Sequence, residues 1–122
     1  MKKIPPELLA EIVWRLVDGL HPESVILFGS HAYGEPSDVS DIDLLVVVPD
    51  SDEPRYRRAR KGYGCLRGLT APTELVVLTR QEIEQGATVP ASLVSQALQR
   101  GQVLYGAGEA QRNTPVADKK PA

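Results

Sequence analysis

The fold is decided by residues 28–48, which read FGSHAYGEPSDVSDIDLLVVV. A short apolar run, residues 25–28, stops at Gly29 and Ser30, and the stretch ends in a second apolar run rich in valine. Both runs have the length of strands, and their apolar residues are continuous rather than alternating, which is typical of strands buried in a sheet. We therefore predict two buried β-strands, with a turn and a short helical segment after the first.

Asp41 and Asp43 stand at the entrance of the second strand, which is predicted over residues 41–48. Side chains two apart along a strand point to the same face, so both carboxylates should project side by side. Adjacent carboxylates repel each other unless a cation lies between them. A divalent cation such as Mg²⁺ takes oxygen ligands and bridges to phosphates, which makes it the natural candidate.

Gly29 and Ser30 could supply the other half of such a site. Glycine has no side chain to keep a phosphate away from the backbone, and serine adds a hydroxyl donor at the start of a helical turn. A phosphate-binding bend next to paired metal ligands indicates nucleotide chemistry. Taken without Asp41 and Asp43, the same bend would read only as a turn at the end of a strand.

The rest of the chain reads as alternating helices and strands. An amphipathic helix is predicted over residues 6–20, a third strand over 74–79, a short helix from the capping box at 79–82, a helix over 90–100 and a last strand or edge segment over 102–105. Glu74 enters the third strand as Asp41 enters the second, so pairing of these two strands would bring Glu74 beside Asp41. The basic segment 55–67 is expected to form a helix broken near Gly62 and Gly64. We predict an α/β (α+β) fold, a small mixed sheet with helices packed on one face.

Composition limits the function classes. The 122 residues fit one domain, predicted over residues 1–105, and the Gly-, Ala-, Pro- and Lys-rich residues 106–122 are predicted to be a disordered C-terminal tail. The net charge of −2 gives no general attraction to nucleic acid or to anionic membranes. Cys65 is the only cysteine, and no apolar run approaches the roughly 20 residues of a membrane span. We expect a cytoplasmic protein that binds neither membrane nor nucleic acid.

Gly29-Ser30, ten intervening residues and Asp41-Ile42-Asp43 resemble the signature of the polymerase-beta-like nucleotidyltransferases. The short chain is similar to the minimal, MNT-type branch, whose members often act as the antitoxin beside a HEPN-domain toxin. The resemblance implies a largely antiparallel mixed sheet, a serine that contacts the nucleoside triphosphate and two aspartates that hold magnesium. It also implies a third carboxylate on a neighbouring strand, and Glu74 occupies that position.

By this resemblance, Asp41, Asp43 and Glu74 would hold two Mg²⁺ ions and the chain would transfer AMP from ATP to a tyrosine hydroxyl of a HEPN toxin. The family usually carries aspartate where this chain has Glu74. A non-catalytic antitoxin that masks its partner by contact therefore stays open, as does a small-molecule nucleotidyltransferase. An ordinary structural domain, in which these residues coincide by chance, is the remaining alternative.

Overall fold

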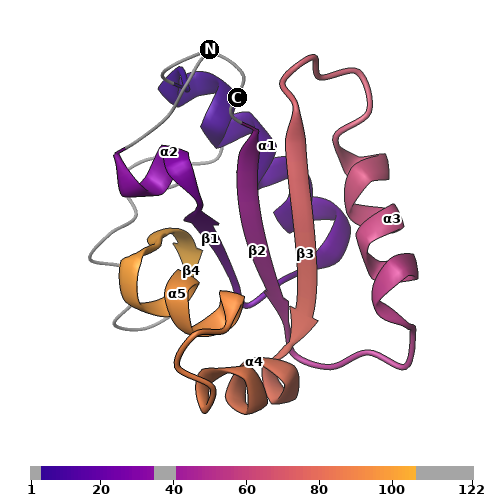
Figure 1. Ribbon diagram of the computed structural model, residues 1–122. Coiled ribbons are helices and arrows are strands. Elements are labelled where there is room, and N and C mark those ends of the chain that lie inside the picture. Colours follow the sequence, from indigo (N-terminus) through magenta and orange to yellow (C-terminus); the bar gives the residue numbers. More distant parts are fainter. Residues whose placement is uncertain (1–3, 35–40, 107–122) are drawn as a thin grey trace.

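A four-stranded mixed sheet forms the centre of the molecule (Figure 1). The computed structural model describes residues 4–34 and 41–106. The strands are β1 (Ser24–Phe28), β2 (Ile42–Val48), β3 (Thr73–Thr79) and β4 (Gln102–Gly106), in the spatial order β3-β2-β1-β4. β1 is antiparallel to both β2 and β4, whereas β2 and β3 are parallel. This confirms the predicted mixed, largely antiparallel sheet.

The described ranges contain five helices, one before β1 and four between the strands: α1 (Pro6–Leu20), α2 (Ser30–Tyr33), α3 (Arg55–Cys65), α4 (Arg80–Ala87) and α5 (Leu93–Arg100). The predicted tail falls almost wholly on residues 107–122, which lie outside the described residues. In the part of the chain that the structure describes, no helix combines the length and the apolar character needed to cross a bilayer.

The helices cover both faces of the sheet, so the expectation of helices on one face is wrong. Leu44, Val46 and Val48 of β2 pack in one apolar cluster with α1, whereas Leu45 and Val47 pack in a second cluster with α5. Figure 1 shows α1 behind the sheet and α5 in front of it. Five consecutive apolar residues leave neither face of β2 polar, so each face needs a covering layer.

Helix α1 has the predicted bounds because its sequence sets both of its ends. Pro6 occupies the first helical position, where its missing N–H would have had no intrahelical partner. The helix ends at Leu20, and the next residue, His21, adopts the left-handed conformation (φ 50°) and donates its backbone N–H to the carbonyl of Val17. The inward stripe of Leu9, Ile12, Val13 and Leu16 is buried in the first cluster.

Helix α3 runs unbroken through Gly62 and Gly64, contrary to the predicted break. Gly62 is buried where α3 crosses the sheet, and a β-carbon there would lie 2.8 Å from Leu75 Cδ1. The glycine lets α3 approach β3 closely, and this packing offsets the roughly 1 kcal/mol that glycine costs inside a helix.

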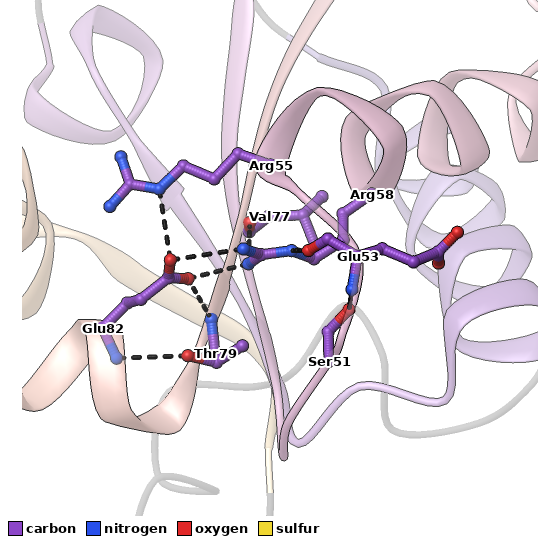
Figure 2. Close-up of polar contacts among 7 residues, drawn as sticks. All are labelled: Ser51, Glu53, Arg55, Arg58, Val77, Thr79 and Glu82. Carbon is purple, nitrogen blue, oxygen red and sulfur yellow. Dashed lines mark hydrogen bonds and ion pairs between the residues drawn. The ribbon is translucent and has the colours of Figure 1, made fainter.

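One arginine of the basic segment is a structural residue that ties three elements together. Arg58 is 7% exposed, and its guanidinium donates to the Val77 carbonyl of β3 (2.9 Å) and to both carboxylate oxygens of Glu82 on α4 (2.7 and 3.2 Å; Figure 2). Glu82 also accepts the Thr79 N–H in the predicted capping box. These contacts, with the Arg58 hydrogen bond first, lower the pKa of Glu82 to about 2.

Candidate active site

The strand register brings the predicted site residues to one edge of the sheet. Phe28, the last residue of β1, pairs with Asp43, and Asp43 pairs in turn with Glu74 of β3. The end of β1 and the starts of β2 and β3 therefore meet, at the top of the view in Figure 1. The edge is open to solvent, because Asp41 and Glu74 are exposed and Asp43 is partly buried.

Asp43 and Glu74 lie on the same face. Asp43 shares its face with Leu45 and Val47, and Glu74 shares its face with Val76, all of which belong to the cluster beneath α5. The sequence pattern suggested that Glu74 would stand beside Asp41. The parallel register instead places it opposite Asp43, because β2 begins at Ile42 and β3 begins at Thr73.

Electrostatic coupling links the three carboxylates. Burial raises the pKa of Asp43, and the negative charges of Glu74 and then Asp41 raise it further. His31 acts in the opposite direction and lowers the pKa of Asp43. The three acids thus share one local field in which a cation would be stabilised.

Gly29 lies directly against the Asp43 carboxylate. Its backbone (φ 77°, ψ −164°) falls in a region that is essentially restricted to glycine. A β-carbon at this position would lie 2.1 Å from Asp43 Oδ2 and 3.0 Å from Asp43 Cγ. The glycine-serine bend and the second aspartate therefore meet in the folded molecule, as the sequence required.

Ser30 begins α2, a single helical turn. The Gly29 carbonyl accepts the backbone N–H groups of Ala32 and Tyr33, each at 3.0 Å, and this closes the turn next to the carboxylates. The predicted position of Ser30, at the start of a short helix after the first strand, is confirmed.

Three oxygen-donating carboxylates fit a hard divalent cation. In the ranges 4–34 and 41–106, no three His, Cys, Asp or Glu side chains already stand as a closed metal cluster. Asp41 and Glu74 are exposed, so their side chains have room to turn toward a shared ion beside Asp43. The suitability of the site for a metal therefore depends on the oxygen ligands that the three carboxylates offer and on their position at one edge of the sheet.

Two surface hollows lined by described residues lie away from these carboxylates. One, of about 780 Å³, lies at the opposite end of β2, between Val48, His21 and Lys61. The other, of about 390 Å³, lies between α4, α5 and β3. The carboxylate edge is thus a separate feature of the surface.

A family profile described as "Nucleotidyltransferase domain" matches residues 7–104, which include all three strands of the carboxylate edge. The chain belongs to the nucleotidyltransferase domain family. No curated protein sequence matches this chain.

Solved structures resemble the nucleotidyltransferase domain at low sequence identity. A Sulfolobus solfataricus protein assigned as a nucleotidyltransferase is 20% identical with a TM-score of 0.57, covering 89% of this chain and 95% of that one. A toxin-antitoxin solved with AMP-PNP is 26% identical with a TM-score of 0.57, and a mutant of the toxin-antitoxin MntA-HpeT is 24% identical with a TM-score of 0.54. Each of these two matches covers 88% of this chain and 78% of the other. The likenesses at 20% and 24% identity show the shared fold.

Two further residues neighbour the site. His31 directly follows Ser30, and its charge lowers the pKa of Asp43. Arg100, at the end of α5, stacks on Tyr33 of α2, and nothing in the local sequence around residue 100 signals this contact. To predict the contact between Arg100 and Tyr33, one would need to know that β4 pairs with β1.

Proposed function

We propose that this nucleotidyltransferase is metal-dependent and transfers AMP from ATP to a hydroxyl group of a partner protein. The observation that carries the proposal is the contact between Gly29 and the Asp43 carboxylate, with Glu74 paired to Asp43 on the next strand. On this proposal, the bend would bind phosphate and the neighbouring carboxylates would supply oxygen donors for a metal within one site. We further propose that the partner is a HEPN-type toxin, so that the chain is its antitoxin in the cytoplasm, where ATP and Mg²⁺ are plentiful.

Asp41, Asp43 and Glu74 would hold Mg²⁺, with two ions expected from the family scheme. The bound metal would neutralise the charge of the triphosphate and lower the pKa of the attacking hydroxyl. Glu74 is exposed and lies on β3, an outer strand of the sheet, so it is the carboxylate best placed to meet an acceptor arriving from solvent. We assign it the acceptance of the hydroxyl proton.

Gly29 and Ser30 would bind the phosphates that leave. The hydroxyl oxygen of the acceptor forms a bond to the α-phosphorus, and the bond from that phosphorus to the bridging oxygen breaks. Pyrophosphate departs with the electron pair of the broken bond. The Ser30 hydroxyl donates to the departing phosphates, and the absence of a side chain at Gly29 lets them lie close to the backbone.

The toxin partner is supported by one structural relative. The toxin-antitoxin solved with AMP-PNP is 26% identical to this chain over 88% of its length. A non-catalytic antitoxin would use the same fold, and the two proposals differ in whether a covalent product forms.

The test is a transfer assay with the protein encoded beside this chain's gene. ATP labelled at the α-phosphorus should label the partner in the presence of Mg²⁺, and ATP labelled at the γ-phosphorus should not. The Asp41→Asn, Asp43→Asn double variant should give no label while remaining folded. Label from the γ-phosphate would indicate a kinase, and no label with a partner that still binds tightly would favour the non-catalytic antitoxin. Undiminished transfer by the double variant would refute the site.

A further inference from the structure

The C-terminal end of α5 lies beside the proposed phosphate site. The helix ends at Arg100, and β4 begins at Gln102, which pairs with Leu27 near the end of β1. Gly101 between them is in close contact with β1, since a β-carbon there would lie 2.9 Å from the Leu27 carbonyl oxygen. Arg100 therefore projects from the part of α5 nearest the bend that follows β1.

Arg100 stacks on the short helix that this bend opens. Its guanidinium carbon lies 4.2 Å from the centroid of the Tyr33 ring. Ser30 and Tyr33 are three residues apart in α2, and residues at that spacing lie on one face of a helix. The cation is thus held on the face of α2 that carries the Ser30 hydroxyl.

The N–H donors of the Arg100 guanidinium are available for a ligand. The guanidinium carbon lies over the Tyr33 ring, and among the described residues these N–H groups form no hydrogen bond. Arg15, Arg55, Arg58 and Arg80 each form an ion pair with a glutamate. Among the described residues, Arg100 forms no such pair. A cation at the end of a helix is favoured by the helix dipole, but the dipole alone does not require the side chain to fold onto Tyr33.

We propose that Arg100, held in place by Tyr33, binds the β- and γ-phosphates of the nucleoside triphosphate. The inference rests on the proposed function and assigns a new binding residue to the same site. The metal-binding carboxylates would hold one side of the triphosphate and Arg100 the other. Planar guanidinium donors match phosphate oxygens in pairs, so Arg100 would favour triphosphates over monophosphates.

The experiment measures the affinity of the purified chain for ATP and for AMP by calorimetry, with Mg²⁺ present. Arg100→Gln should weaken ATP binding by about tenfold or more, as expected for a charge-assisted hydrogen bond, and leave AMP binding unchanged. Arg100→Lys should weaken it less, since it keeps the charge but loses the planar fork. Tyr33→Leu should fall between wild type and Arg100→Gln. Arg57→Gln, which removes an exposed arginine of α3, is the matched control and should bind ATP as wild type does.

Two results would overturn the inference. One is unchanged ATP affinity in Arg100→Gln, and the other is an equal loss of ATP and AMP affinity, which would place Arg100 away from the terminal phosphates. Thermal unfolding of each variant shows whether a loss of binding is merely a loss of fold, and Arg100→Lys then supplies the decisive comparison. A wild-type chain that binds no ATP would refute the proposed function itself, which is a different outcome from a variant that binds as well as wild type.

Discussion

Replacing Gly29 by alanine would disturb the site at its closest contact. The backbone at Gly29 has φ 77° and ψ −164°, a conformation that costs any other residue roughly 1–3 kcal/mol. The new methyl group would also overlap the carboxylate of Asp43, with Oδ2 at 2.1 Å and Cβ at 3.2 Å. Rotating the Asp43 side chain would move its oxygens away but would leave the contact with Cβ, so the bend and the carboxylate must separate.

The expected outcome for Gly29→Ala is a modest loss of stability and a large loss of function. For a domain of this size, the backbone cost corresponds to a fall in Tm of roughly 5–20 °C. Mg²⁺-dependent ATP binding and AMP transfer should fall much further than stability does, because the Asp43 oxygens would no longer face the site. Thermal unfolding and calorimetric titration on the same samples separate these two effects.

Gly68→Ala is the matched control for this prediction. Gly68 also has a positive φ (93°), but a β-carbon there would meet no atom within 4 Å. This variant should lose a comparable amount of stability, about 1–2 kcal/mol, and should keep ATP binding. Wild-type ATP affinity in Gly29→Ala, or equal losses of affinity in both variants, would refute the reasoning.

Four further predictions concern charge. Burial, Glu74 and Asp41 raise the pKa of Asp43 above the ordinary aspartate value of 3.8. As the pH is lowered, Mg²⁺ affinity should therefore begin to fall before the pH reaches 3.8. In metal titrations, Glu74→Gln should move this loss of affinity to lower pH. Because the pKa of Asp43 is higher in the folded chain, the ionised carboxylate destabilises the fold once the pH rises above that pKa. Without metal, Asp43→Asn should therefore have a higher Tm than wild type at neutral pH, and a lower Tm would contradict this. Glu74→Gln should slow AMP transfer more than it weakens ATP binding, and equal losses in the two assays would argue against its role as proton acceptor. Folding lowers the pKa of Glu82 from 4.5 to about 2, which corresponds to at most about 3 kcal/mol of stability. This stabilisation is present above pH 4.5 and is lost as the pH falls toward 2. Urea unfolding of Glu82→Gln at pH 7 and at low pH checks this, and a variant as stable as wild type at pH 7 would contradict it.

Much of the site could be predicted because it depends on short-range patterns. Gly29-Ser30 follows one apolar run and Asp41 and Asp43 precede another, so the two halves were expected at the ends of neighbouring strands. The capping box from Thr79 likewise depends on four consecutive residues and is confirmed.

The remaining features depend on long-range packing. The pairing of Glu74 with Asp43 depends on the register of two parallel strands. A shift of two residues in this register keeps the same side chains on each face, so the hydrophobic pattern does not determine it. The continuity of α3 through Gly62 depends on its contact with Leu75, which only the folded chain brings near. The stacking of Arg100 on Tyr33 is of the same kind.

A crystal structure of the chain with Mg²⁺ and a non-hydrolysable ATP analogue tests the central claim most directly. It should show metal ions bound by Asp41 and Asp43, with Glu74 at the acceptor side and a terminal phosphate on Ser30. A nucleotide bound elsewhere, such as in the hollow beside His21 at the opposite end of β2, would contradict the account. So would a nucleotide at the carboxylate edge with no metal between its phosphates and the two aspartates.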